Sequence, residues 1–376
     1  MQAVQQQGYE SATVLYMAME LSHRKWKLGF SNGQRIRRKT IEARNCQQLL
    51  DEVALAKQRL KVAPQAPVKV CFEAGRDGHW IYHWLSEEGF EVLEIDSSSI
   101  ETARGRKHVK TDRVDVEKLL DLLMRYANGY RRAFSVVRVP SSEAEAGQRL
   151  HREDEYLMRQ RARVNNQIKS LLVTQGVAEV PLKRGFEDWL ETAQKWDGSD
   201  LSHALKDELG RLYAHYELIN AHLAEVAQAY QQELHSDTAV ADKRRRLEQL
   251  KSIGPKTSRV LSAEVFAWRV FRNGKQVGGM SGLTPTPSQS GDVQREQGIS
   301  KAGNRRVRRV MIELAWLWLQ WQPDSALSQW FNRRFARGGK RMRRIGIVAL
   351  ARKLLVALWR YVEWGVVPEG AVLKTA

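Results

Sequence analysis

Four acidic residues in the first third of the chain have the types and spacing of a site for a hard divalent cation. Two of them, Asp112 and Asp115, are three residues apart, so both carboxylates lie on one face of a helical turn. Apolar residues continue at helical spacing behind them: Val116, Leu119, Leu120 and Leu123. Two carboxylates held this close repel each other unless a cation lies between them. The simpler alternative is a capping box at the start of an amphipathic helix.

Two further acids stand upstream where a metal site would need them. Glu20 ends the mostly apolar run 12–20, and Glu73 ends a second apolar run that begins at Val68. Four oxygen donors without His or Cys favour Mg²⁺ or Mn²⁺ over zinc. Two such ions could clamp the attacking and leaving oxygens of a phosphodiester displacement. The alternatives are a solvent-facing strand residue for Glu20 and a surface acid for Glu73.

The elements that would position these acids follow one another in a recognisable order. Three strands are predicted as a meander, with Asn32-Gly33 as a two-residue hairpin turn, and a helix, a strand, a helix and a strand follow. This is the order of a ribonuclease H-like domain, in which Glu20 and Glu73 converge with the Asp112/Asp115 helix. The predicted strands cover residues 12–20, 26–30, 35–41, 68–73 and 90–95, and the predicted helices cover residues 47–60 and 79–88.

Composition indicates a polyanionic partner. The chain of 376 residues has 61 Lys and Arg against 43 Asp and Glu, a net charge of +18, which points most simply to nucleic acid. The nearest approach to a membrane span, residues 345–367, contains four charged side chains, and the first seven residues do not form a signal peptide. Two cysteines cannot form a zinc cluster, and Cys71 lies in an apolar run typical of a buried, inert thiol. We therefore expect no membrane and a cytoplasmic, nucleoid-associated protein.

The middle of the chain is predicted to be a helical arm. After a linker at about 128–140, a helix starts at Ser141 or Ser142 and continues to about Leu172 with near-heptad spacing, and a second helix covers 200–234. The arm serves either as a partner-contacting coiled coil or as a plain helical hairpin. The basic run 243–246 at its end is expected to be a solvated helix face.

The last third combines a serine-containing loop with basic clusters. Residues 250–257 open a helix, and their Gly-containing turn either binds phosphate, as a helix–hairpin–helix does, or is an ordinary loop with Pro at a helix start. Residues 278–291 are small and Pro-rich, so we expect a loop. A serine there could attack a phosphate whose charge is neutralised by the basic stretches 297–309 and 333–344; the alternative is a loop that only grips phosphate.

Two sets of motifs, in this order around the arm, resemble one family. The chain resembles the DEDD transposases of bacterial insertion sequence family one-ten, which are similar to Piv invertases and include bridge-RNA-guided recombinases. The front set is Glu20, Phe72-Glu73-Ala74 and Val109-Lys110-Thr111-Asp112-Arg113-Val114-Asp115. The rear set is Ile253-Gly254-Pro255, Gly282-Leu283-Thr284-Pro285, Gln289-Ser290-Gly291 and Ile299-Ser300-Lys301-Ala302-Gly303-Asn304. The chain departs from the pattern at Glu20, where the family has Asp.

The resemblance implies an α/β plus all-α architecture. It comprises a RuvC/ribonuclease H-like catalytic domain at 10–130, a helical coiled-coil arm at 140–240, and a mainly helical transposase domain at 243–376 with a helix–hairpin–helix-like start and the serine loop.

The resemblance also implies an activity. Glu20, Glu73, Asp112 and Asp115 would bind Mg²⁺, and Ser290, or else Ser288, would be the nucleophile that forms a covalent phosphoserine with DNA. Donor and target DNA, a structured guide RNA, and a homodimer or homotetramer are the implied partners. The alternatives are a metal-dependent RuvC-like junction nuclease, in which water attacks, and a catalytically inactive nucleic-acid-binding protein.

Overall fold

The chain divides into two compact units, residues 1–140 and 141–376. The computed structural model describes residues 14–75, 77, 79–100, 112–177, 180, 182, 185–290 and 293–374. For Ser98 and for residues 112–115, 287–290 and 293–297 it describes the backbone alone. The first unit is mixed α/β, and the second consists of helices and one β-hairpin. None of the described helices combines the length and the apolar character that crossing a membrane requires.

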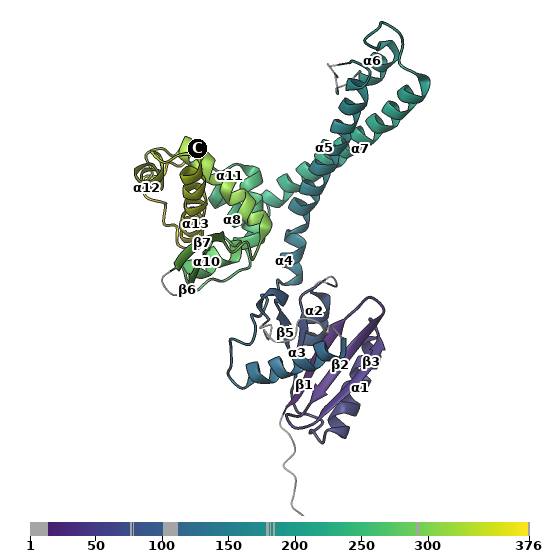
Figure 1. Cartoon of the computed structure of the whole chain (residues 1–376), viewed down its shortest axis with the longest axis vertical. Coiled ribbons are helices and arrows are strands. Elements are labelled where there is room, and N and C mark those ends of the chain that lie inside the picture. The colour runs from purple at the N-terminus through teal and green to yellow at the C-terminus, as the bar shows by residue number, and fades with distance from the viewer. Residues whose placement is uncertain are drawn as a thin grey trace, which may run out of the picture. The chain divides into compact units, whose positions relative to one another are not determined.

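A five-stranded sheet organises the first unit, in the order β3-β2-β1-β4-β5 (Figure 1). Strand β2 runs antiparallel to β1 and β3, whereas β4 is parallel to both β1 and β5. The element order predicted from the sequence is confirmed, and it is consistent with a ribonuclease H-like sheet. The strands are β1 Leu15–Leu21, β2 Lys25–Ser31, β3 Ile36–Glu42, β4 Val68–Glu73 and β5 Glu91–Ile95.

Helices cover both faces of this sheet. Helices α1 (Cys46–Arg59) and α2 (Trp80–Glu87) pack on one face, over a core that includes Met19 and Phe72. Helix α3 (Asp112–Ala127) packs on the other face, over Ala18 and Cys71. Since consecutive strand residues point to opposite faces, the apolar runs of β1 and β4 supply both cores. A short 3₁₀ turn, η1, covers Ser97–Ser99.

The turn between β2 and β3 is longer than predicted. Residues 32–35 connect the strands, so the prediction of a two-residue hairpin was wrong. The Asn32 side chain closes the turn, because its Oδ1 accepts hydrogen bonds from the backbone N–H groups of Gln34 and Arg35 at 3.0 and 2.9 Å. Gly33 follows with a φ of 93°, a conformation that suits glycine.

The second unit begins with the arm. Helices α5 (Arg149–Val173) and α7 (His203–Leu234) pack side by side, joined through the short α6 (Phe186–Thr192) (Figure 1). The near-heptad seam predicted for the first helix is present, and its buried apolar positions are Leu157, Val164, Ile168 and Leu172. The helix predicted from residue 141 is interrupted at Gln148, which separates α4 (Ser142–Gly147) from α5. There the backbone N–H of Gln148 bonds to the carbonyl of Glu145, three residues back, at 3.1 Å.

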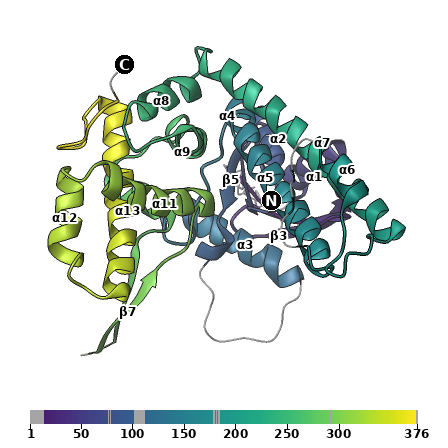
Figure 2. The same cartoon turned by 90° about the horizontal axis from the view of Figure 1, so that it is seen from above.

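The rest of the second unit is a helical layer around Leu314, Trp318, Leu350 and Leu354. Its helices are α8 Ala239–Glu248, α9 Pro255–Leu261, the π-helix η2 Ser262–Phe266, α10 Gly274–Ser281, α11 Arg305–Trp321, α12 Ala326–Phe335 and α13 Lys340–Trp364. Strands β6 (Pro285–Ser290) and β7 (Val293–Ile299) form a two-stranded hairpin that extends away from these helices (Figure 2). Pro255 occupies the first turn of α9, so a helix starts in this segment as predicted, which both alternatives for the Gly-containing turn share.

One part of the basic run 243–246 is not solvated. Arg244 is 1% exposed, and its guanidinium donates to the Tyr230 carbonyl and to Glu248 Oε1, both at 2.9 Å. The prediction of a solvated face was therefore wrong for this residue. Its burial depends on partners in α7 and α8, which periodicity within the run does not reveal.

Candidate active site

The two acids that end sheet strands lie next to each other in the structure. Met19 is in register with Phe72 across the parallel β1–β4 pair, so Glu20 and Glu73 occupy the next positions on neighbouring strands. Met19 and Phe72 pack in the core under α1 and α2, so the alternation of the strands places Glu20 and Glu73 on the face that α3 covers. Glu20 is half-buried and Glu73 is exposed. This arrangement suits two oxygen ligands that approach one cation from adjacent strands.

Helix α3 begins at Asp112, as predicted, so the backbones of Asp112 and Asp115 form its first turn. The next residue, Val116, packs against β2, because a Cβ placed on Gly29 would lie 2.5 Å from the Val116 Cγ1. The side chains of Asp112 and Asp115 lie outside the described residues, and so does the Lys110-Thr111 that precedes them. Among the described side chains, no three or more His, Cys, Asp or Glu residues form a group suited to a metal ion.

Cys71 lies beside this face and is not a reactive group. Burial raises the pKa of its thiol, and the negative charge of Glu73 raises it further. The thiol contacts the Leu119 carbonyl of α3 at 3.6 Å. The prediction of a buried thiol is confirmed, and the protonated form does not compete for a hard cation.

The serine segment is a β-hairpin rather than a loop. The expectation of a loop over 278–291 was wrong, because residues 274–281 form α10 and residues 285–290 form β6. Pro285 and Pro287 suggested a loop, but a two-stranded ribbon has only edge strands, where proline is tolerated; the ladder is irregular between these two residues. Ser290 is the last residue of β6 and pairs with Val293 of β7. The side chains of Ser288 and Ser290 lie outside the described residues.

Two glycines let the chain cross itself at the base of this hairpin. Gly282 has a φ of 66°, and a Cβ there would lie 2.1 Å from the Ala302 carbonyl oxygen. Gly303 has a φ of 102°, and its Cβ would lie 2.2 Å from the Met280 carbonyl oxygen. The motifs at 282–285 and 299–304 are thus the two sides of one crossing, where glycine is required both by conformation and by space.

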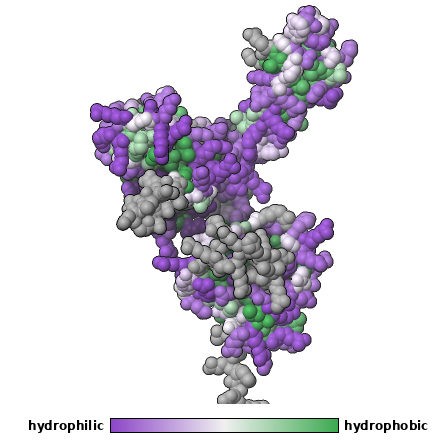
Figure 3. All heavy atoms as spheres, in the orientation of Figure 1, coloured by the Kyte–Doolittle hydropathy of each residue, from purple (hydrophilic) through white to green (hydrophobic). Residues whose placement is uncertain are grey.

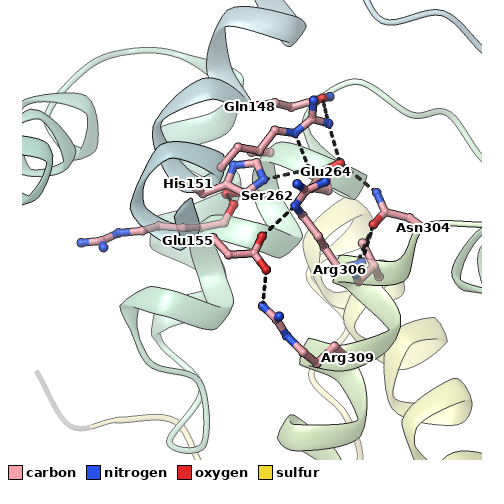
Figure 4. Close-up of polar contacts among 12 residues, drawn as sticks. Gln148, His151, Glu155, Ser262, Glu264, Asn304, Arg306 and Arg309 are labelled. Atoms are coloured by element: carbon pink, nitrogen blue, oxygen red, sulfur yellow. Dashed lines mark hydrogen bonds and ion pairs between the residues drawn. The ribbon is translucent and has the colours of Figure 1, made fainter. Parts of the chain in front are cut away.

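Asn304 joins this crossing to helix α11. Its backbone N–H donates to the Met280 carbonyl at 2.8 Å, and its Oδ1 caps α11 by accepting from the N–H groups of Arg306 and Val307 at 3.0 and 3.1 Å. Its Nδ2 donates to Glu264 Oε2 at 2.8 Å (Figure 4). A single side chain therefore links the hairpin base, the helix start and a buried acid.

Glu264 is the most buried acid of this region, and inspection of the sequence did not single it out. It is 2% exposed in the π-helix η2 and faces His151 and Arg152 of α5 (Figure 4). Burial alone would raise the pKa of Glu264, but the hydrogen bonds from His151 and Arg152 outweigh it and lower the pKa to about 2. Its position inside the mostly apolar run 260–268 was the sequence signal for a buried acid that needs hydrogen-bond partners.

A second acid of α5 lies beside it. Glu155 bonds to Arg306 and Arg309 of α11, at 2.8 Å each (Figure 4). Burial would raise the pKa of Glu155, but hydrogen bonds and charge from the two arginines lower it. Two arginines of the basic stretch 297–309 are thus paired within the protein and are less available to a nucleic acid.

A different basic surface is fully available. We define the α12–α13 basic surface as seven cations around the turn between these helices: Arg333, Arg334, Arg337, Lys340, Arg341, Arg343 and Arg344. Among the described residues, no acid forms an ion pair with any of them. In Figure 3 the outer edge of the region around α12 is covered by hydrophilic side chains. Such a surface suits the phosphate backbone of DNA or structured RNA.

Comparison with known proteins covers both units. A protein-family model for the DEDD transposases of IS110, with the description "Transposase", matches residues 27–175. A second family model, with the description "Transposase IS116/IS110/IS902 family", matches residues 244–330. The first match starts after Glu20, so this acid lies outside it.

Curated relatives align along most of the chain. A putative transposase, y4rJ, of Sinorhizobium fredii is 40% identical over 376 residues, which cover 96% of this chain and 95% of the relative. The transposase for insertion sequence element IS1328 of Yersinia enterocolitica is 24% identical over 80% of this chain and 85% of its own length. A probable family 20 transposase of Pseudomonas aeruginosa is 27% identical over 78% of this chain and 83% of its own length.

Proposed function

The chain belongs to the IS110 family of insertion-sequence transposases, which cut and rejoin DNA, and we propose that it does so with a serine nucleophile and carboxylate-bound Mg²⁺. The observation that carries the proposal is the placement of Glu20 and Glu73 at neighbouring positions on one sheet face, under the helix that starts at Asp112. An all-oxygen donor set on a strand pair and a helix start is chemically suited to Mg²⁺.

In this proposal the four acids Glu20, Glu73, Asp112 and Asp115 hold the metal. Bound Mg²⁺ supplies charge neutralisation for the phosphate oxygens during displacement. Glu20 is one methylene longer than the Asp of the family pattern, so its carboxylate would reach an ion either from a shifted backbone or in a different rotamer. The donor set does not favour a soft metal, because the neighbouring Cys71 thiol is buried and stays protonated.

Ser290 is proposed as the nucleophile. Its Oγ forms a bond to the phosphorus as the bond from phosphorus to the 3′ oxygen breaks, which releases a 3′ hydroxyl and leaves a 5′ phosphoserine. In the second step a 3′ hydroxyl of the partner strand attacks the same phosphorus and the bond to Oγ breaks, which regenerates the serine. Each step exchanges one phosphoester bond for another, so no high-energy cofactor is required.

The proposed partners are donor and target DNA and a structured guide RNA from the element's own end. The α12–α13 basic surface and the net charge of +18 support polyanionic partners. We propose a homodimer or homotetramer in which the arm contacts a second copy and the acids of one protomer act with the serine of another.

The test is to trap the covalent protein–DNA adduct. The substrate is a labelled duplex that spans the junction between the element and its flank, with Mg²⁺ and RNA transcribed from the element's end. Ser290→Ala should abolish the adduct while RNA binding stays intact, and the matched variant Ser288→Ala should retain both. An adduct in Ser290→Ala that disappears in Ser288→Ala would reassign the nucleophile.

The metal half of the proposal is tested by Asp112→Asn. This change keeps the size of the side chain but removes a negative charge, so Mg²⁺-dependent cleavage should be lost. Free 5′ phosphate ends without any adduct in the unmodified protein would instead indicate a junction nuclease in which water attacks. Cleavage that is unchanged in Asp112→Asn would contradict the carboxylate site.

A further inference from the structure

The buried carboxylate of Glu264 accepts hydrogen bonds at both oxygens. Oε1 accepts from His151 Nε2 at 2.8 Å and from Arg152 Nε at 3.0 Å. Oε2 accepts from Arg152 Nη2 at 3.2 Å and from Asn304 Nδ2 at 2.8 Å. The donors come from α5 and from the cap of α11, and the acid itself lies in a π-helix, a local widening that is frequent at functional sites.

The base of the hairpin is where its orientation is set. Strands β6 and β7 pair only with each other among the described strands, and a two-stranded ribbon has little stability of its own. Leu283 lies just before β6 and Ile299 is the last residue of β7, and both pack on the helical core. The close approach of the chain at Gly282 and Gly303 lies beside them. Asn304 stabilises this crossing by donating its backbone N–H to the Met280 carbonyl, and its side chain in turn donates to Glu264.

Small motions at this base become large at Ser290. The six residues of β6 extend over about 20 Å at about 3.3 Å per residue, so a tilt of about 10° at the base would move Ser290 by about 3 Å. A misplacement of about 1 Å can reduce the rate of a positioned reaction by about 10²-fold. The hydrogen bonds that fix the base are therefore able to control the reaction without touching the DNA.

We propose that Glu264 is the positioning residue of the serine hairpin, which it fixes through Asn304 and ties to the arm helix α5 through His151 and Arg152. The inference rests on the proposed role of Ser290 as the nucleophile. It assigns to a residue outside the acid set and the serine a specific part in the reaction. It also links the arm to the position of Ser290, because a shift of α5 would move His151 and Arg152, which bind the same carboxylate.

The hydrogen bond between positions 264 and 304 has a polarity that can be reversed. Glu264→Gln replaces one acceptor oxygen by an N–H₂ group. In either orientation of the amide this group faces a hydrogen-bond donor of a neighbouring residue, so at least one contact is lost. Asn304→Asp keeps the acceptor that caps α11 but places a second carboxylate against Glu264. The double variant restores a donor and an acceptor, because the new amide at position 264 can donate to the new carboxylate at position 304. It also keeps the net charge of the pair.

Two measurements on the full-length chain separate positioning from general stability. The first is amide hydrogen exchange in β6 and β7, compared with exchange in the buried part of α13. The second is the single-turnover rate of adduct formation on the junction duplex at saturating DNA, together with the Kd for that duplex. Glu155→Gln is the matched control, because Glu155 also joins α5 to α11 but its bonds go to Arg306 and Arg309.

Each single variant should speed exchange in the hairpin by a larger factor than in α13, and should form the adduct about 10²-fold more slowly with an unchanged Kd. The double variant should recover to within about tenfold of the unmodified protein, and Glu155→Gln should leave hairpin exchange unchanged. Hairpin exchange that is unaltered in both single variants, exchange that rises equally in α13, or a double variant no better than the worse single variant would overturn the proposal.

Failure of the proposed function is recognised separately. If Ser290→Ala still forms the adduct, the nucleophile assignment is wrong, and hairpin exchange in the 264 and 304 variants still decides whether Glu264 holds this element. If Ser290→Ala abolishes the adduct while both single variants form it at the normal rate, Glu264 has no positioning role.

Discussion

Replacing Glu264 by Gln should make the stability of the second unit depend on pH in a defined way. The pKa of Glu264 is lowered from 4.5 to about 2 in the folded chain, against the effect of burial, by hydrogen bonds from His151 and Arg152. A gap of this size corresponds to about 3 kcal/mol of stability. Because the folded pKa is the lower one, this stability is fully present above pH 4.5 and is lost as the pH falls toward 2.

The quantity to measure is the difference in unfolding free energy between the unmodified protein and Glu264→Gln. Urea unfolding, scored by hydrogen exchange in peptides of α11 and α13, reports on this unit alone. The difference should be about 3 kcal/mol at about pH 7 and should shrink steadily between pH 4.5 and 2. The exposed Glu313→Gln is the matched control, with an expected change within about 0.5 kcal/mol. A Glu264→Gln difference that stays constant or grows as the pH falls would refute the reasoning.

Two further predictions concern the hairpin base and the nucleic-acid surface. Gly282→Ala should destabilise the second unit by about 3 kcal/mol or more in urea unfolding, because its Cβ would meet the Ala302 carbonyl. Gly298→Ala is the control: its φ of 89° is also positive, but its Cβ would have nothing within 4 Å, so the same measurement should show a loss of only about 1 kcal/mol. Equal losses would show that backbone conformation, not the crossing, requires glycine. Replacing Arg341, Arg343 and Arg344 by Ala should lower the slope of log K against log salt for duplex binding by about 2 to 3, as titrations at several salt concentrations can measure. An unchanged slope would place the nucleic acid elsewhere.

The first unit was predictable because its strands are evident from local sequence. The apolar run that ends at Glu73 was predicted with the bounds that β4 has, and the other strands were found within a few residues. The central strands are buried on both faces, so their composition reports their environment directly. The start of α3 at Asp112 was equally visible, since helical spacing follows it.

In the second unit, the sequence did not predict the features that depend on partners distant in sequence. The serine hairpin contains prolines and small residues, whose local preferences indicate a loop, and its strand pairing arises between segments that are both weak strand formers. Arg244 is buried because Tyr230 and Glu248 accept its hydrogen bonds and Glu233 lies nearby. Glu264 likewise has a role that three residues from two other elements define, and no spacing within its own helix reveals them.

The outermost strand of the five-stranded sheet has a consequence for how copies of this chain behave together. Among the described strands, β3 has one neighbour, β2, and it carries Arg37, Arg38 and Lys39, which pair with Glu52 and Glu117. The same strand of a second copy would have to place its own charged residues beside these ion-paired side chains, and charged residues on an edge strand disfavour such pairing. At the opposite border, β5 is shielded by the segment near Val136, whose neighbours bond to Glu94 and Asp96. Both borders of the sheet are thus protected against edge-to-edge pairing with the sheet of a second copy.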